Sequence, residues 1–297
     1  MTILFDTPQV RVFQSALFQT NSTVVTTDDL VLVVDPNWLP VEIAEIRQFV
    51  ETQSKGKKPV YLLFTHSDYD HIIGYAAFSD IAESVIASHI FVENEGKETT
   101  LRQIRDFDDE YYIERNYPIE YPSVSHVISH DGQTLKIGET ELTFFKAAGH
   151  NPDGIFTIVN GHYWIAGDYL CGVEFPYIYH SSIAYEKTLR KTDKILKDFD
   201  IQLLISGHGA PTTDKSEILT RQKDAFEYIN AVRESIKDNL FFDFEAYIAY
   251  KGYRFPRIMR KFHEGNLNLI RSEIFNWVLH GFSRINADYT LLILNLH

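Results

Sequence analysis

Histidines and carboxylates gather in four short segments of this chain, and each segment follows a run of residues typical of a β-strand. The first, THSDYDH at 65–71, follows the apolar run Val60–Phe64 and places two histidines and two aspartates within six positions. The others are GHNPDG at 149–154, GDY at 167–169 and SGHG at 206–209. Because strands are rigid, side chains at their ends are held in place, so these segments predict one site built at strand ends.

The clustered side chains are of the kinds that bind metal ions. The first four lie on one predicted loop between a strand and a helix, and can therefore approach a metal from one side. The last three each follow a glycine, which permits tight turns and a close approach of the backbone. Burying several carboxylates together without a cation is too costly for a purely structural role. The candidate ligands are His66, Asp68, Asp70, His71, His150, Asp168 and His208.

The pattern of apolar residues predicts a mixture of strands and helices. Strands are predicted at Val10–Phe18, Thr23–Thr27, Leu30–Val34, Val60–Thr65 and Val85–Ala87, with a helix at Pro40–Glu51 and another beginning over Ile72–Phe78. From Thr134 the strand pattern resumes as TLKIG, ELTFFKAA, IFTIVN and HYWIAG, with turns at Gly138 and Asn160-Gly161. Helices are predicted at Ala184–Phe199 and Asp214–Asn239, a last core strand at Gln202–Ile205, and mostly helix at Phe241–Trp277.

This order of elements predicts a layered α/β sandwich. No Pro/Gly/Ser linker divides the chain, so we expect residues 1–213 to form the core and residues 214–297 a mostly helical C-terminal extension packed on the same domain. The charged and aromatic segment 99–121 is predicted to be a helical or irregular insertion, either a lid or a solvated face. The tail 278–297, with its apolar run Leu291–Leu294, has no partner that the sequence identifies.

Here the sequence resembles the metallo-β-lactamase superfamily. The signature of that family is a His-x-His-x-Asp-His loop, followed by a single His, a single Asp and a last His at strand ends. The chain is similar in order, spacing and flanking residues over roughly residues 10–210, and four motifs in the correct order are far more specific than one. The resemblance implies a four-layered αββα sandwich and a metal-dependent hydrolase.

Carried over position by position, the resemblance also implies two metal sites. It assigns His66, Asp68 and His150 to one ion, Asp70, His71 and His208 to the other, and Asp168 to a bridge between them. Two cations sharing a hydroxide would make a nucleophile available at neutral pH. The second ion would polarise the substrate's carbonyl or phosphoryl oxygen, and Asp70 would accept or return a proton as the catalytic residue.

Asp68 departs from the family signature, which has a histidine at that position. An additional anionic oxygen ligand shifts the preference of the site from zinc toward manganese or iron. The identity of the two divalent ions (Zn, Mn or Fe) therefore stays open. A weakened site with only one firmly bound ion is the alternative, and the otherwise complete ligand set favours two.

The remaining histidines are expected to play structural roles, because none lies in a ligand-like motif. They are His89, His126, His130, His162, His263, His280 and His297, with His180 in an aromatic segment described next. Cys171, three residues beyond Asp168, is expected to be a small buried apolar residue and not a ligand. Residues that could border the pocket, although packing is the more common role, are Tyr69, Asn151, Tyr177, Tyr179 and His180.

The net charge of −13 argues against a nucleic-acid partner and against an anionic membrane surface. A metal centre would make the local electrostatic potential positive despite the net negative charge. A small-molecule substrate, including an anionic one, is therefore compatible with this charge. The single cysteine excludes an internal disulfide, and neither a signal peptide nor a membrane-spanning run is visible. These features predict a cytoplasmic protein. They do not decide between a monomer and a homodimer.

Three classes of function fit the sequence. The first is a binuclear hydrolase that uses a metal-bridging hydroxide on a small ester, lactone, thioester or phosphodiester. The second is an iron-dependent oxidoreductase, either diiron or similar to persulfide dioxygenases, for which Asp68 is the support. Flavodiiron proteins carry a flavodoxin-like domain, which nothing after Asp214 resembles. The third is a sensor that uses the metal pocket to hold a ligand.

Overall fold

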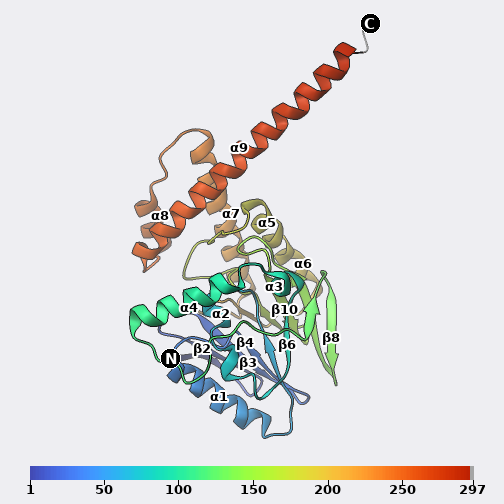
Figure 1. Ribbon diagram of the computed structural model, residues 1–297, viewed down its shortest axis with the longest axis vertical. Helices are drawn as coiled ribbons and strands as arrows, with labels where there is room; N and C mark the ends of the chain where they lie inside the picture. The colour runs from blue at the N-terminus through green and yellow to red at the C-terminus, as the bar shows by residue number, and fades with distance from the viewer. Residues whose placement is uncertain (295–297) are drawn as a thin grey trace.

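Two β-sheets form the centre of the molecule (Figure 1). The computed structural model describes residues 1–294, with the side chains of residues 1–275. The first sheet contains, in spatial order, β1 (Thr2–Asp6), β2 (Val10–Gln14), β3 (Asn21–Thr26), β4 (Val31–Val34), β5 (Val60–Leu63), β6 (Ala82–Ser88) and β7 (His126–Ile128). Neighbouring strands are antiparallel from β1 to β4 and parallel from β4 to β7.

The second sheet contains, in spatial order, β12 (Leu203–Ile205), β11 (Tyr163–Ile165), β10 (Ile155–Val159), β9 (Thr140–Lys146) and β8 (Gln133–Ile137). Its strands are antiparallel except for the pair β11 and β12. The parallel pairs in both sheets place the carboxyl ends of several strands at the same edge, and the site described below is built there.

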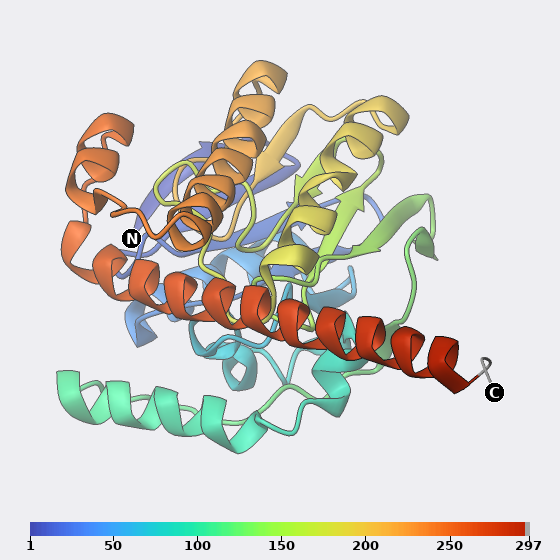
Figure 2. The same ribbon diagram turned by 90° about the horizontal axis from the view of Figure 1, so that it is seen from above.

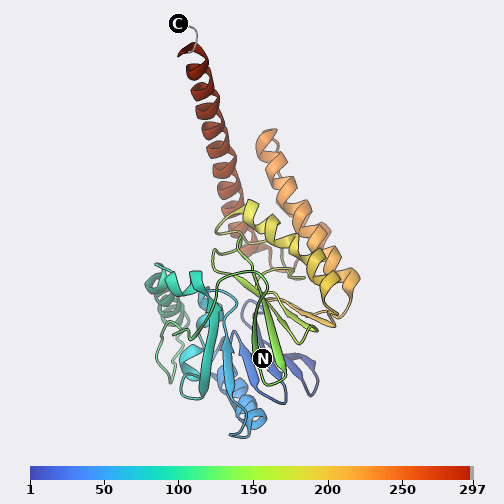
Figure 3. The ribbon, with the colours of Figure 1, turned by 90° about the vertical axis from the view of Figure 1, so that its right-hand side faces the viewer.

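Helices cover the outer faces of both sheets, as the side view in Figure 3 shows. On the first sheet lie α1 (Pro40–Ser54), α2 (Tyr69–Ile72), the 3₁₀ turn η1 (Tyr75–Ala77), α3 (His89–Glu93) and α4 (Lys97–Tyr111). On the second lie α5 (Ser182–Leu189), α6 (Lys191–Asp198), α7 (Lys215–Lys237), α8 (Phe244–Lys251) and the beginning of α9 (Pro256–Leu294). Seen from above in Figure 2, α9 crosses the molecule, and α4 runs along the same side.

The layers follow from the alternation of side chains along each strand. In β4, Val33 packs outward in the cluster that contains Ile46 of α1. Its neighbour Leu32 packs inward in the cluster that contains Phe144 of the second sheet. A third apolar cluster joins the outer face of the second sheet to α5–α9. Three apolar cores between four layers make the predicted αββα sandwich with a helical C-terminal region.

The structure corrects several predicted elements. Strands β1 and β7 were not predicted, because they are short and half exposed and become strands by pairing with β2 and β6. The single helix predicted over Ala184–Phe199 is two helices that meet at Arg190, and both Leu189 and Ile195 point into the same core.

The helix predicted to begin over Ile72–Phe78 also differs. Instead, α2 begins at Tyr69, and the chain leaves it at Gly74, where a Cβ would lie 2.1 Å from the Pro36 carbonyl oxygen. The apolar run Leu291–Leu294 lies in the part of α9 whose side chains are not described. Within the described residues, no helix combines the length and apolarity that crossing a membrane requires.

Candidate metal centre

The structure brings the seven candidate ligands together at one edge of the two sheets. The segment 65–71 follows β5, His150 follows β9, and Asp168 and His208 follow the parallel strands β11 and β12. The seven side chains form two adjacent groups. One consists of His66, Asp68, His150 and Asp168, and the other of Asp70, His71 and His208. These are the two sets that the resemblance implies, except that Asp168, which it assigns to a bridge, is grouped with the first set.

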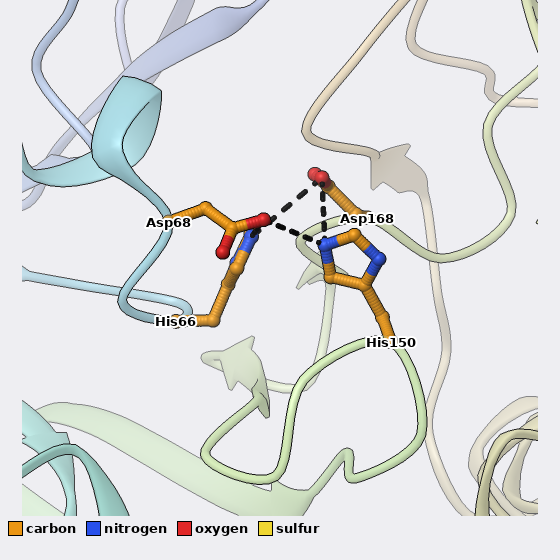
Figure 4. A group of neighbouring side chains, drawn as sticks. All are labelled: His66, Asp68, His150 and Asp168. Atoms are coloured by element: carbon orange, nitrogen blue, oxygen red, sulfur yellow. Dashed lines mark hydrogen bonds and ion pairs between the residues drawn. The ribbon is translucent and has the colours of Figure 1, made fainter. Parts of the chain in front are cut away.

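In the first group, ring nitrogens face carboxylate oxygens across a small space (Figure 4). Nε2 of His150 lies 3.1 Å from Oδ2 of Asp68 and 3.3 Å from Oδ2 of Asp168. Nε2 of His66 lies 3.6 Å from the same two oxygens. Ligand atoms arranged tetrahedrally at about 2.0–2.2 Å from one ion are about 3.4 Å apart, so these spacings suit a shared cation.

The second group has similar spacings and is linked to the first by Asp168. Nε2 of His208 lies 3.7 Å from Oδ2 of Asp70, and Nε2 of His71 lies 3.8 Å from that atom. Oδ1 of Asp168 is 3.2 Å from Nε2 of His71, and its Oδ2 is 3.3 Å from Nε2 of His208. Asp168 therefore reaches histidines of both groups, as a bridging carboxylate must.

Each of the four histidines is held through Nδ1, which leaves Nε2 directed at the centre. The Nδ1 partners are the hydroxyl of Thr65 for His66 (3.0 Å), Asp35 for His71 (2.9 Å), the Tyr177 carbonyl for His150 (2.6 Å) and the Phe18 carbonyl for His208 (2.9 Å). Such partners fix the tautomer and the ring orientation of metal-binding histidines. The four rings are therefore oriented to bind through the same nitrogen.

Several atoms at the centre lack a hydrogen-bond partner although they are buried. They include Nε2 of His66, Nε2 of His71 and Oδ1 of Asp168. Buried polar atoms without a partner are costly, and a bound cation would satisfy these three. The residues present thus fit divalent metal ions, which the superfamily described below typically binds.

The charges of the group point to the same conclusion. Burial opposes a positive charge on His150, yet Asp168 and Asp68 raise the pKa of its imidazole well above the ordinary value. Burial likewise opposes ionisation of Asp168, while His208, His71 and His66 hold the pKa of its carboxyl well below the ordinary value. A centre that attracts protons so strongly onto its histidines is one in which cations can replace those protons.

Two glycines permit this packing. At Gly207 a Cβ would lie 2.0 Å from Oδ1 of Asp168 and 2.9 Å from Cε1 of His71. Gly149 has a φ of +139°, and a Cβ there would lie 2.3 Å from the backbone of Tyr185. The glycines that precede His208 and His150 are therefore required by close approach and by backbone conformation, as expected from the sequence.

Asp68 is held by a residue next to another candidate ligand. Asn151 donates a hydrogen bond from Nδ2 to Oδ1 of Asp68, and this leaves Oδ2 facing His66 and His150. Burial opposes ionisation of Asp68, but hydrogen bonds from His150 and His66 lower the pKa of its carboxyl. The carboxylate is thus oriented toward the histidines of the first group.

Two supporting residues were missed from the sequence. Asp35 is buried at the end of β4, where it accepts hydrogen bonds from the Thr65 amide (2.9 Å) and hydroxyl (2.6 Å) and contacts His71. Thr20 donates a hydrogen bond of 3.1 Å to Oδ2 of Asp70. Neither lies in a motif, although an aspartate directly after the apolar strand Leu30–Val34 was a usable signal.

The metal centre opens into a cavity of about 1010 Å³. Its lining includes Tyr69, Asn151, Tyr177 and Tyr179, four of the five residues that the sequence offered as pocket candidates; His180 is not among its lining residues. The insertion contributes Gln103 of α4, and α9 contributes one whole wall. The segment 99–121 is therefore helical up to Tyr111 and borders the cavity.

Glu174 also lines this cavity and was not singled out from the sequence. Burial raises the pKa of its carboxyl to about 7, against the opposing influence of His208. Cys171 lies outside the two ligand groups, and burial raises the pKa of its thiol well above the ordinary value, as suits an inert side chain.

A layered sandwich with a histidine- and carboxylate-lined centre at its strand ends defines a class of metal-binding α/β proteins. The sequence model of the Metallo-beta-lactamase superfamily matches residues 16–208, which include all seven candidate ligands. The chain belongs to this superfamily.

Individual relatives agree with this assignment. The chain is 26% identical to the probable metallo-hydrolase YqgX of Bacillus subtilis over 209 residues, which is 69% of this chain and 90% of that protein. Its fold is similar to the inverting sec-alkylsulfatase Pisa1 of Pseudomonas sp. (TM-score 0.63, 16% identity, 91% of this chain and 50% of that one). It is also similar to a metallo-beta-lactamase family protein of Thermus thermophilus (TM-score 0.58, 16% identity, 86% of this chain and 92% of that one).

Proposed function

We propose that this protein is a hydrolase with two divalent metal ions that cleaves an ester, lactone, thioester or phosphodiester bond of a small molecule. His66, Asp68 and His150 would hold one ion, Asp70, His71 and His208 the other, and Asp168 would bind both. The observation that carries the proposal is the convergence of four Nε2 atoms and three aspartates on a buried centre that opens into a cavity.

When bound, the two ions would supply a water molecule that is acidic near neutral pH and a Lewis acid for the scissile group. The protein's own side chains position the proton-transferring carboxylate and form the surroundings of the centre. Thr20 fixes the carboxylate of Asp70 at the cavity wall, where Asp70 can take up a proton from the attacking water and return it to the leaving group. Tyr69 and Tyr179 line the cavity into which the centre opens.

The expected surroundings of this hydrolase follow from charge and composition. A net charge of −13 disfavours nucleic-acid substrates and anionic membranes, and the single cysteine suits a cytoplasmic protein. We therefore propose a small-molecule substrate in the cytoplasm, and leave the choice of zinc, manganese or iron, and of monomer or homodimer, to experiment.

The proposal is tested with a panel of nitrophenyl esters, lactones, thioesters and a bis-nitrophenyl phosphodiester. Asp168→Asn keeps the size of the side chain but removes the charge that histidines of both groups contact. The rate of hydrolysis should therefore fall by more than about a hundredfold. Such a loss exceeds the one usual for residues that only hold a metal ligand in place. His130→Asn is the matched control, because His130 is exposed and belongs to neither ligand group. Equal activity in Asp168→Asn and the native protein would reject the proposal.

Asp68 supports a second candidate, an iron-dependent oxidoreductase. Its carboxylate faces the histidines of the first group and would supply a hard oxygen ligand that favours iron over zinc. Iron as the bound metal, together with oxygen consumption and no hydrolysis of the panel, would select this reading. Negligible turnover with tight binding of a product would instead indicate a sensor.

A further inference from the structure

We infer that the substrate is a carboxylic ester whose linear apolar acyl chain lies along α9. This inference rests on the proposed function and names the substrate class. The ligand-lined end and the α9 wall belong to one cavity of about 1010 Å³, which is large for a small-molecule pocket. A molecule that reaches the metal centre therefore contacts α9 if it is long enough.

One face of α9 forms the wall. The lining residues of the helix follow the spacing i, i+1, i+3, i+4, i+7, i+8 and i+11, which places them along a single stripe. They are Ile258, Met259, Lys261, Phe262, Gly265, Asn266 and Leu269. Eleven helical rises span about 16 Å, so the stripe is long and narrow, as a linear chain requires. Leu17 and Val173 add apolar surface from other segments.

The stripe has two polar members, the exposed Lys261 and the buried Asn266, and the hydrogen-bonding groups of Asn266 are already paired within the protein. Asn266 accepts a hydrogen bond from the Ile178 amide (2.9 Å) and donates one to the Pro176 carbonyl (2.7 Å). It also donates to the hydroxyl of Tyr228 (3.0 Å), and it is 1% exposed. Apart from Lys261, the wall therefore offers a ligand mainly the apolar side chains of Ile258, Met259, Phe262 and Leu269.

Gly265 provides room in the middle of the wall. A Cβ built there would have no heavy atom within 4 Å, and Gly265 is one of the residues that line the cavity. Glycine inside a helix costs about 1 kcal/mol relative to alanine. An open channel across a helical glycine suits a chain that lies against the backbone.

Aromatic side chains connect the wall to the metal centre. The ring of Tyr179 lies 5.0 Å from the His150 ring and 6.2 Å from the Phe262 ring, measured between centroids. Phe262 also stacks on Tyr177 at 4.1 Å. A chain attached to a carbonyl carbon at the ligands would pass Tyr179 and then reach Phe262 and Gly265.

The reaction balances as an ordinary hydrolysis. The oxygen of water bonds to the carbonyl carbon, the bond from that carbon to the alcohol oxygen breaks, and a proton from water passes to the alcohol. The fatty acid leaves as a carboxylate, and the second proton of the water is released to solvent. No oxidant or reductant is needed.

The inference is tested with nitrophenyl esters from acetate to dodecanoate on the enzyme loaded with manganese. Each methylene buried against the wall should raise kcat/KM by about fourfold until the wall is filled. Gly265→Leu adds a side chain at the wall, where its Cβ has no heavy atom within 4 Å. The ratio of kcat/KM for decanoate to that for acetate should therefore fall by about tenfold or more, the value of roughly two methylenes. Asn268→Leu, at an exposed position of the same helix outside the lining, is the matched control and should leave the ratio unchanged.

A binding measurement separates failure of this inference from failure of the proposed function. A dansyl-labelled undecanoic acid should bind the native protein with increased fluorescence, and Gly265→Leu should weaken this binding. Chain binding without hydrolysis of any ester would support the channel and reject the hydrolase. Hydrolysis that does not depend on chain length, with equal ratios in Gly265→Leu and Asn268→Leu, would overturn the inference and leave the hydrolase standing.

Discussion

Asp68 and Asn151 form a hydrogen-bonded pair at the first ligand group of the candidate metal centre. The amide of Asn151 holds one carboxylate oxygen and leaves the other facing the histidines. A histidine at position 68 would replace an anionic oxygen ligand with a neutral nitrogen, and softer ligand sets favour zinc.

Asp68→His should therefore shift the metal preference of the first group toward zinc. After exposure to equal zinc and manganese, we expect the bound zinc-to-manganese ratio to rise by about tenfold, equivalent to about 1.4 kcal/mol. Elemental analysis after gel filtration measures the ratio. Asp68→Asn serves as the control, since it removes the charge without adding a nitrogen ligand of the imidazole type. An unchanged ratio in Asp68→His would show that residue 68 does not bind metal.

Gly207→Ala should abolish metal binding through a single methyl group. The new Cβ would lie 2.0 Å from Oδ1 of Asp168, so the carboxylate must leave its position between the two histidine groups. We expect loss of most bound metal and of activity, with a far-ultraviolet circular dichroism spectrum close to that of the native protein. Full metal content in this variant would mean that the site tolerates a displaced Asp168.

The candidate ligands could be predicted from the sequence, whereas the residues that orient them could not. The candidate ligands follow strands in motifs with characteristic spacing, and such local patterns can be recognised in the amino-acid sequence. The carbonyls of Phe18 and Tyr177 accept from His208 and His150 across long sequence separations, and any residue type can supply a carbonyl. The hydrogen bonds that fix the ring tautomers therefore become visible only in the folded chain.

At the scale of elements, α9 is joined to the loop that supports the first ligand group. Glu273 accepts hydrogen bonds from the Ser181 hydroxyl (2.7 Å) and the Ser182 amide (3.0 Å), and Asn266 holds residues 176 and 178. The same loop supplies the carbonyl that orients His150. The mostly helical C-terminal extension was predicted, but its contact with the cavity was not, because its apolar periodicity is weak and does not indicate which face is covered.

The C-terminal helices should make stability sensitive to mild acid. His263, 4% exposed, lies among aromatic rings next to the Tyr228 hydroxyl, and burial lowers the pKa of its imidazole to about 4. In the unfolded chain the imidazole of His263 gains a proton near its ordinary pKa of 6.5. The contribution of neutral His263 to stability is therefore present above pH 6.5 and is lost as the pH falls toward 4. Linkage gives a loss of about 3 kcal/mol.

His263→Gln should reduce this acid sensitivity. Denaturant unfolding at several pH values between 7 and 4 measures it, because the midpoint of the variant should fall less steeply than that of the native protein. His130→Gln, an exchange at an exposed histidine, should follow the native curve. Parallel curves for all three proteins would show that His263 does not titrate in this range.

At the scale of the whole molecule, the candidate metal centre contains residues from both sheets. Its ligands follow strands β5, β9, β11 and β12, so metal ions would connect the two halves of the sandwich. Ions that bind only the folded state stabilise it by about 2.7 kcal/mol per site at a hundredfold excess over Kd. Calorimetry should therefore show a lower Tm by several degrees in chelator-treated protein, restored by manganese in the native protein but not in Asp168→Ala.

The central claim is that seven side chains hold two metal ions, and metal content tests it most directly. Protein purified without chelator or added metal should contain close to two equivalents of a divalent metal by elemental analysis, and Asp168→Ala, purified in parallel, should lose most of it. Native protein without metal after reconstitution, or an Asp168→Ala variant with full metal content, would contradict the assignment.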